Sequence, residues 1–191
     1  MLRAAMYLFW EHGYEAVSVS DLTAAMGIGT RSLYAAFGSK EELFREAVTV
    51  YNSAAPTGRL DRQPTARRAI EAMLRDNADA YLDPDTPRGC MVVLAATNTS
   101  PANEHVRMLL ADLRDRDRAA VLARLRRGVE DGDLPGTTDV EAVASFYLTV
   151  LHGLSIQARD GCSPSTMHKI IDNAMGAWDS VVGRATPVDT W

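Results

Sequence analysis

Side chains suited to binding anions and base edges gather between residues 30 and 40. One short segment contributes Thr30, Arg31, Ser32 and Tyr34, and Lys40 follows just beyond it. The guanidinium of Arg31 can bind a guanine edge through two hydrogen bonds, and the hydroxyls of Ser32 and Tyr34 suit phosphate oxygens. Lys40, in the first turn of the next expected helix, adds a positive charge to amide groups that already favour an anion. A plainer interpretation stays open, in which Arg31 is a solvated surface charge and Tyr34 a packing residue.

These side chains need a scaffold of two short helices joined by a tight turn. Ser18 and Asp21 have the spacing of a capping box that opens a helix ending at Gly27. Residues 27–29 predict the turn, and residues 30–37 predict the second helix. This arrangement is typical of a helix-turn-helix, whose second helix enters the major groove of DNA. We expect small residues where the helices cross and apolar anchors beneath them: Ala24, Ala25 and Gly27, and Leu22, Ile28, Leu33 and Phe37.

Helical periodicity extends along nearly the whole chain, and strand-like alternation is absent from the sequence. The sequence therefore predicts an all-α fold. We expect a three-helix helix-turn-helix DNA-binding domain over residues 1–46 and a helical-bundle ligand-binding and dimerisation domain over residues 47–186. The expected helices cover residues 2–12, 18–27, 30–37, 39–51, 64–81, 90–98, 100–130, 139–159 and 163–183.

The bulk charge argues mildly against nucleic acid as the partner. The chain carries 20 Lys and Arg against 25 Asp and Glu, a net charge of −5, whereas many nucleic-acid-binding domains are basic. Any DNA contact must therefore come from a few well-placed groups. The sequence has no apolar run near the ~20 residues that span a bilayer and no signal-peptide pattern, so we expect a cytoplasmic protein.

Enzymatic chemistry is not expected. The four histidines are scattered, and the sequence shows no nucleophile–base pair, no phosphate-cradling glycine loop and no ligand spacing for a metal or cofactor. Cys90 and Cys162 also lack metal-ligand spacing, and a reduced, buried thiol is the plain interpretation of each. A redox-sensing role for Cys90 stays open.

Apolar side chains are in excess towards the C-terminus. Residues 142–156 are apolar nearly all round, and residues 167–182 form a broad apolar stripe. Together they present more apolar surface than one bundle core needs. A two-fold interface between copies of the chain would use the excess.

The middle helices offer residues for a small-molecule pocket, and their apolar character predicts a hydrophobic or aromatic ligand. Asn77 lies on an otherwise apolar stripe, so it must find a partner in the protein, in water or in a ligand. A satisfied core asparagine and gap-filling methionines are the plain alternatives. The candidate lining residues are Met73, Asn77, Tyr81, Met91, Leu94, Asn98, Phe146 and His152.

One stretch of the sequence, residues 2–50, resembles the signature of the tetracycline-repressor (TetR) family. The resemblance rests on Gly13-Tyr14, Ser18-Val19, Asp21-Leu22, Ala24-Ala25, Gly27-Ile28, Ser32-Leu33-Tyr34, Phe37 and Ser39-Lys40-Glu41-Glu42-Leu43. The family implies an all-helical dimer joined through its last two helices, with N-terminal helices that read DNA and a divergent C-terminal domain that binds a ligand. The resemblance implies DNA contacts at Ser18, Gly29, Thr30, Arg31, Ser32, Tyr34 and Lys40.

Two features depart from the family pattern. Many relatives have glycine at the position of Arg31, so their base preference does not carry over. The chain also starts inside the first expected helix, where relatives usually carry an often basic extension. Either the extension is lacking or the start has been trimmed, and without it we expect lower affinity and lower salt dependence.

The sequence thus predicts a homodimeric transcriptional repressor that is released from a palindromic operator by a small hydrophobic ligand. Three alternatives stay open. One is a DNA-binding protein without a ligand, a second is a redox-responsive regulator acting through Cys90, and a third is an activator rather than a repressor.

Overall fold

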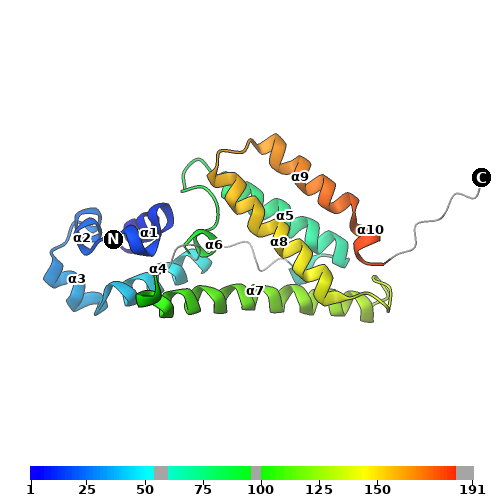
Figure 1. Cartoon of the computed structure of the whole chain (residues 1–191), viewed down its shortest axis with the longest axis horizontal. Helices are drawn as coiled ribbons and strands as arrows, with labels where there is room; N and C mark the ends of the chain where they lie inside the picture. The colour runs from blue at the N-terminus through cyan, green and yellow to red at the C-terminus, as the bar shows by residue number, and fades with distance from the viewer. Residues whose placement is uncertain (54–59, 96–99, 184–191) are drawn as a thin grey trace, which may run out of the picture. The chain divides into compact units, whose positions relative to one another are not determined.

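The computed structural model describes residues 1–53, 60–95 and 100–183, and within these ranges it contains helices and no strand (Figure 1). Helices make up 78% of the described residues, which confirms the predicted all-α fold. None of the described helices is both long and apolar enough to cross a membrane. The helices are α1 (Leu2–Ala16), α2 (Val19–Met26), α3 (Thr30–Phe37), α4 (Lys40–Ser53), α5 (Ala66–Tyr81), α6 (Met91–Leu94), α7 (Glu104–Glu130), α8 (Val140–Arg159), α9 (Pro164–Gly176) and α10 (Trp178–Val181), with a 3₁₀ turn (Pro101–Asn103) before α7.

The chain forms two compact units, and each unit draws on two separate stretches of sequence. The N-terminal unit comprises residues 1–55 and 81–114, and the C-terminal unit comprises residues 56–80 and 115–191. Helix α7, with 27 residues, contributes its first part to the N-terminal unit and the remainder to the C-terminal unit. The division into domains at residues 46 and 47 stays a prediction.

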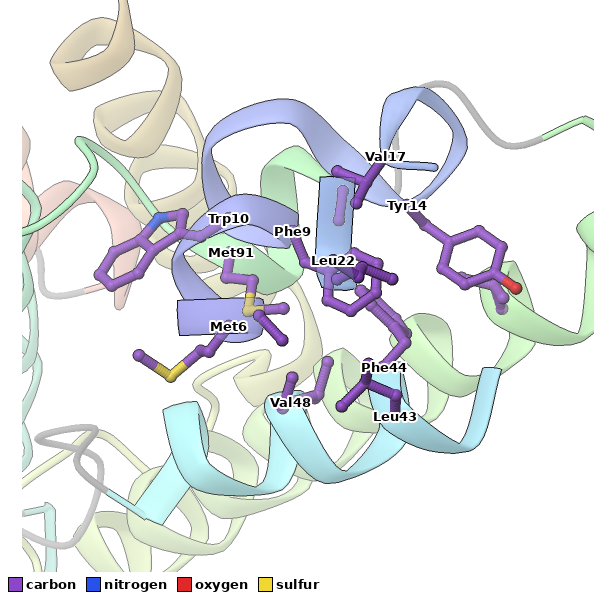
Figure 2. Close-up of a cluster of buried hydrophobic side chains, with 14 of the residues drawn as sticks. Met6, Phe9, Trp10, Tyr14, Val17, Leu22, Leu43, Phe44, Val48 and Met91 are labelled. Carbon is purple, nitrogen blue, oxygen red and sulfur yellow. The ribbon is translucent and has the colours of Figure 1, made fainter. Parts of the chain in front are cut away.

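The core of the N-terminal unit is rich in aromatic rings (Figure 2). Phe9 and Tyr14 of α1 both meet Phe44 of α4 edge-on, with ring centroids 5.0 and 5.1 Å apart. Trp10, also on α1, donates its Nε1–H to the carbonyl of Gly89 at 3.0 Å. The indole therefore buries its apolar body with its polar atom satisfied.

Residues far along the chain complete this core. Met91 and Val92 of α6 are buried in the same cluster, as are Val106 and Leu110 of α7. Side chains four residues apart lie on one face of a helix, so Val106 and Leu110 present a single apolar edge. The first turns of α7 therefore belong to the core of the N-terminal unit.

In the C-terminal unit, polar bonds fasten α9 to both α8 and α5. The hydroxyl of Tyr147 on α8 donates to the carbonyl of Ala174 on α9 at 3.1 Å. Burial raises the pKa of Tyr147 to about 12, so its hydroxyl remains a donor at neutral pH. Arg75 of α5 forms an ion pair with Asp172 of α9 at 2.7 Å and with Glu71 of its own helix at 3.0 Å.

The guanidinium of Arg124 is buried in the C-terminal unit. Arg124 of α7 is 2% exposed, and its Nη2 donates to the carbonyl of Gln63 at 3.2 Å and lies 3.8 Å from Asp133 Oδ2. Asp133 itself accepts the N–H of Ala66 at the start of α5. Among the described residues, Nε and Nη1 of Arg124 have no hydrogen-bond partner. Arg124 thus ties α7 to the start of α5 while leaving two buried donors unmatched, each at a cost of about 1–3 kcal/mol.

The predicted capping box of α2 is confirmed, and α4, α8 and α9 also begin with a side-chain cap. Ser18 Oγ accepts the Asp21 N–H at 3.1 Å, and Asp21 Oδ2 accepts the Ser18 N–H at 2.9 Å, which completes the capping box of α2. The hydroxyl of Ser39 accepts the N–H three residues on, at 3.0 Å. Asp139 caps α8 and Ser163 caps α9 in the same way. Each side-chain oxygen satisfies a donor that the helix itself cannot.

Two helix boundaries differ in detail from those expected. Gly13, with φ +76° and ψ 171°, breaks the regular helix at the expected end, but a further turn continues α1 to Ala16. Burial of Tyr14 in the core holds this further turn in place. The stretch 163–183, expected as one helix, divides into α9 and α10 at Ala177, whose ψ of −1° interrupts the regular helix.

The apolar stripe around Asn77 on α5 lies mainly in the core. Ala69, Ile70, Leu74 and Ala78 are buried with Asn77, whereas Met73 is half-buried and Ala80 is exposed. Apolar residues stand on adjoining faces of α5, so periodicity alone did not determine which face meets the core. Helix α6 covers only four residues of the expected 90–98, and Asn98 lies outside the described residues.

Candidate nucleic-acid interface

Helix α3 is anchored in the core through the buried side chain of Leu33, which leaves its polar side chains exposed. Leu33 is fully buried, and Ile28 and Phe37 pack against the same core as partly buried residues. These three residues confirm the predicted anchors and fix α3 through one side. The opposite side carries the predicted contact residues, and all of them are exposed: Thr30, Arg31, Ser32 and Tyr34.

Tyr34 is not a packing residue. Its side chain is 47% exposed, on a helix whose fully buried residue is Leu33. A large aromatic side chain held partly in solvent beside Arg31 suits contact with another molecule. The plainer interpretation of Tyr34 is therefore wrong.

The turn between α2 and α3 depends on Gly27. Its φ of +66° lies in the left-handed region, and its N–H donates to the Ala24 carbonyl at 3.3 Å. Among the described residues nothing would lie within 4 Å of an added Cβ, so the conformation and not a lack of space requires glycine. The expectation that Ala24 and Ala25 lie where the helices cross is wrong, because both are exposed. The fully buried Leu22 and Leu33 hold the two helices instead.

Gly29 forms the N-terminal cap of α3 without a side chain. Its φ of −79° and ψ of 158° are accessible to any residue. The first N–H groups of a helix have no partner within the helix. Because Gly29 offers no capping oxygen, these N–H groups of α3 are available to an external acceptor such as a phosphate oxygen.

The hydroxyl of Ser18 is less available than expected. It donates to Asp21 Oδ2 at 2.6 Å and accepts the Asp21 N–H at 3.1 Å. The hydrogen bonds that the Asp21 carboxylate accepts from the hydroxyl and the backbone N–H of Ser18 lower its pKa, so the acceptor stays charged at neutral pH. The single proton of the hydroxyl is thus used inside the capping box. A phosphate contact at this end of α2 would fall to the backbone N–H groups of its first turn.

Lys40 opens α4 and is held over an aromatic ring. Its Nζ lies 4.3 Å from the centroid of the Tyr14 ring, within the range of a cation–π interaction. Burial lowers the pKa of Lys40, while the negative charges of Glu15 and Asp21 raise it. The ammonium group is therefore positioned by α1 rather than free in solvent.

The start of α7 contacts the N-terminal unit through two carboxylates that the sequence analysis missed. Glu15 accepts the Ser100 N–H at 2.7 Å and an N–H of the Asn103 side chain at 2.9 Å. His105 Nε2 lies 3.0 Å from Glu41 Oε2. The partners of Glu15 are 85 and 88 residues away in sequence, so no spacing signal could have linked them.

The candidate ligand residues are divided between the two units. In the C-terminal unit, Asn77 is 8% exposed and donates its Nδ2–H to the Met73 carbonyl at 2.8 Å, so part of its polar requirement is met within α5. Phe146 is 39% exposed on α8. His152 is half-buried and has a partner of its own.

The remaining candidates belong to the N-terminal unit. Met91 is fully buried in the aromatic core, Tyr81 is buried, and Leu94 is half-buried. The structure thus brings Met91 together with α1 and α4 rather than with Asn77. The ligand-binding set stays a prediction.

Cys90 has the surroundings of an unreactive thiol. Burial raises its pKa, and hydrogen bonds with Tyr51 and Tyr81 oppose that rise only in part. A raised pKa leaves less thiolate, which is the reactive form of cysteine. In the described part of the chain, no group of three His, Cys, Asp or Glu side chains could hold a metal ion.

Two family models match this chain. "Bacterial regulatory proteins, tetR family" matches residues 1–47, and "BetI-type transcriptional repressor, C-terminal" matches residues 66–177. The HTH-type transcriptional repressor ComR of Escherichia coli (strain K12) is 30% identical over 185 residues, which cover 95% of this chain and 88% of ComR. The HTH-type transcriptional repressor BdcR of the same strain is 30% identical over 166 residues, 85% of this chain and 79% of BdcR.

Solved structures agree with these sequence matches. A cysteine mutant of the TetR family transcriptional regulator CifR, complexed with 26bp double-strand operator DNA, matches with a TM-score of 0.90 and 43% identity over 93% of this chain and 94% of that chain. MexZ from Pseudomonas aeruginosa, at 19% identity and a TM-score of 0.74, shows the shared fold alone. The chain therefore belongs to the TetR family of bacterial transcriptional regulators, with α2 and α3 as its helix-turn-helix.

Proposed function

We propose that this chain is a homodimeric repressor that binds a palindromic operator through α3 and the first turn of α4 and leaves it when a small hydrophobic ligand binds. The observation that carries the proposal is the exposed polar face of α3, set on the buried Leu33. The related ComR and BdcR are named as repressors, and the related CifR was solved on operator DNA.

Each DNA contact follows from the chemistry of its residue. Arg31 would bind a guanine edge in the major groove, which is the contact that discriminates sequence. Ser32, Tyr34 and the open N–H groups of α3 would bind phosphates and fix the register. Because the chain as a whole is acidic, with a net charge of −5, these few groups would carry the electrostatic attraction to DNA.

Two glycines support a dimer through α8 and α9. Within the described residues, an added Cβ at Gly153 or Gly176 would have no neighbour within 4 Å, so the fold of one chain does not require glycine there. Glycine inside a helix costs about 1 kcal/mol relative to alanine. Gly153 shares a face of α8 with Phe146 and Ile156, which are 39% and 43% exposed. Close approach of a second copy would account for the glycines and would cover the two apolar side chains.

The match of residues 66–177 to a repressor C-terminal model supports a ligand that binds in this part of the chain. A ligand would release DNA only if it binds the conformation that cannot bind DNA more tightly than the conformation that can. The redox alternative through Cys90 is disfavoured, because burial raises the pKa of the Cys90 thiol.

Selection of genomic DNA fragments with the purified protein tests the DNA-binding part. The bound fragments are expected to share a palindromic site. Arg31→Ala should weaken binding to that site by about 5- to 150-fold, which corresponds to the ~1–3 kcal/mol of a bidentate base contact. Arg126→Ala, which removes an exposed charge from the C-terminal unit, serves as the control. Equal operator affinity of the Arg31→Ala protein and the wild type in gel-shift titrations would refute the assignment of α3.

Light scattering tests the dimer. Gly153→Leu places a bulky side chain where one chain has room and a second copy would not, so the variant should be monomeric. Ala120→Leu places the same side chain on an exposed position of α7 and should leave the dimer intact. A dimeric Gly153→Leu protein would exclude this face of α8 as the interface.

A further inference from the structure

The first turns of α7 are fastened to the N-terminal unit by both apolar and polar contacts. Val106 and Leu110 are fully buried in the core of that unit. At the very start of the segment, Ser100 and Asn103 both donate to Glu15, at 2.7 and 2.9 Å. Helix α7 then continues without a break into the C-terminal unit. A displacement of α7 within the C-terminal unit would therefore reach Glu15.

The carboxylates that hold α7 flank the residues that place Lys40. Glu15 directly follows Tyr14, whose ring lies 4.3 Å from Lys40 Nζ. Glu41, which lies 3.0 Å from His105 Nε2, directly follows Lys40. Ser100 and Asn103, directly before α7, hold Glu15, and His105 of α7 holds Glu41. Each member of the Lys40–Tyr14 pair is therefore next in sequence to a residue that this segment holds.

We propose that Glu15 is a positioning residue for operator binding, and that its bond to Asn103 is a latch that keeps the ammonium group of Lys40 available to a DNA phosphate. The inference rests on the proposed function, because Lys40 can act in this way only if the first turn of α4 faces DNA. In this arrangement, the segment that leads into α7 controls whether the positive charge of Lys40 is available at the DNA-binding surface.

Charge competition gives the latch its effect. Glu15 receives its hydrogen bonds from Asn103 and Ser100, and these bonds, followed by the charge of Lys40, lower its pKa to about 2. When α7 withdraws its donors, Lys40 is the cation that remains in the field of the charged Glu15. A lysine paired with a carboxylate releases no counterion from DNA. Opening the latch therefore weakens DNA binding without removing a single DNA-contacting residue.

The substitution Asn103→Asp opens the latch. It places a carboxylate against Glu15 in place of the amide donor. An acidic residue at the start of a helix is favourable for the helix, so α7 should still form. With the DNA fragment recovered in the selection experiment, operator affinity is expected to fall about tenfold. The plot of log operator affinity against log salt concentration has a negative slope, and its magnitude should decrease by about 0.9 for each Lys40 that no longer contacts a phosphate.

Three further variants separate positioning from simple charge. Ala102→Asp adds the same charge at the neighbouring exposed residue and should change affinity less than threefold. The double variant Glu15→Gln/Asn103→Asp has the net charge of the wild type. The amide introduced at position 15 can now donate to the carboxylate introduced at position 103, so the variant should recover wild-type operator affinity. In a Lys40→Ala background, Asn103→Asp should have no further effect, because the latch acts through Lys40.

Several results would overturn the latch. These are an unchanged affinity for Asn103→Asp, an equal loss in Ala102→Asp, no recovery in the double variant, or the same tenfold loss in the Lys40→Ala background. A wild type that recovers no DNA fragment at all would instead refute the proposed function, and the latch with it. Melting curves of all variants should stay close to that of the wild type, and a variant that melts much lower would assign Asn103 a structural role only.

Discussion

The two units differ in how completely each satisfies its buried polar atoms. In the N-terminal unit, the aromatic core is closed and the indole N–H of Trp10 reaches a carbonyl. In the C-terminal unit, two donors of the buried Arg124 have no acceptor among the described residues, and Phe146 and Ile156 stay exposed on α8. The N-terminal core is thus closed by matched contacts, whereas the C-terminal unit buries two unmatched donors, and both units keep large apolar side chains at the surface, among them Tyr34 and Met108 in the first.

The largest expected effect comes from truncating one aromatic residue in each unit. Phe44→Ala removes a fully buried ring and should lower the free energy of unfolding by about 3–5 kcal/mol. Phe146→Ala removes a ring that is 39% exposed in one chain, so it should lower the stability of the monomer by less than ~1 kcal/mol while weakening association. Urea denaturation at several protein concentrations measures both. Equal losses for the two variants would remove the contrast between the units.

Arg124→Met should stabilise the C-terminal unit. The methionine keeps an apolar side chain in the buried site and removes two unmatched donors. It gives up one bond to Gln63 and the 3.8 Å ion pair with Asp133, whose carboxylate keeps its bond to the Ala66 N–H. Because the removal of two unmatched donors outweighs these losses, the free energy of unfolding is expected to rise by about 1 kcal/mol. The matched substitution at the exposed Arg126 should change it by less than ~0.5 kcal/mol. A clear loss of stability in Arg124→Met would mean that the guanidinium is fully paired in solution.

Substitution of one glycine in each unit, Gly27 and Gly153, should change stability by smaller amounts and in opposite directions. Gly27→Ala forces a side chain into φ +66° and should cost about 1–2 kcal/mol of unfolding free energy. Gly153→Ala should stabilise dilute, monomeric protein by about 1 kcal/mol, because alanine is the better helix former. At high protein concentration that gain should disappear as the added methyl group disturbs the dimer. Thermal melts over a range of concentrations would show it, and a gain independent of concentration would count against the interface.

The smallest effect concerns acid. The pKa of Glu15 falls from 4.5 to about 2 on folding, chiefly through the Asn103 and Ser100 bonds. A carboxyl with a lowered pKa stabilises the fold above pH ~4.5 and loses that contribution as the pH falls to ~2. Glu15→Gln should therefore show a weaker dependence of stability on pH between those limits and an unchanged dependence above pH 5. Glu46→Gln, at an exposed site on α4, is the control. Parallel pH profiles for wild type and Glu15→Gln would show that the bonds to α7 do not persist in solution.

The sequence predicted most accurately those local features that depend on residues close together in the chain. The Ser18–Asp21 capping box, the turn at Gly27 and the exposed side of α3 each depend on residues a few positions apart. Periodicity was weaker where several faces were apolar, as on α5, where Leu74 rather than Met73 is buried. Such a choice depends on which helix packs there, and a single helix does not contain that information.

Contacts between distant segments were not predictable. Nothing in the spacing of Glu15 and Asn103 joins them across 88 residues. The environment of Lys40 was missed for the same reason, because the position of Tyr14 beneath it depends on how α1 packs on α4. Met91 was taken for a pocket residue since an apolar residue in a middle helix suits a core and a pocket equally, and only the fold places it among the aromatic rings of α1 and α4.

The order in which the chain is made bears on this core. Val106 and Leu110 fill the same cluster as Phe9 and Phe44, so the core beneath the DNA-binding surface is completed only after residues as far along the chain as Leu110 have left the ribosome. Contacts of such long sequence separation slow folding, because the intervening loop must close first. A nascent chain that stalls before α7 would present an open apolar cluster, which is a target for chaperones rather than for DNA.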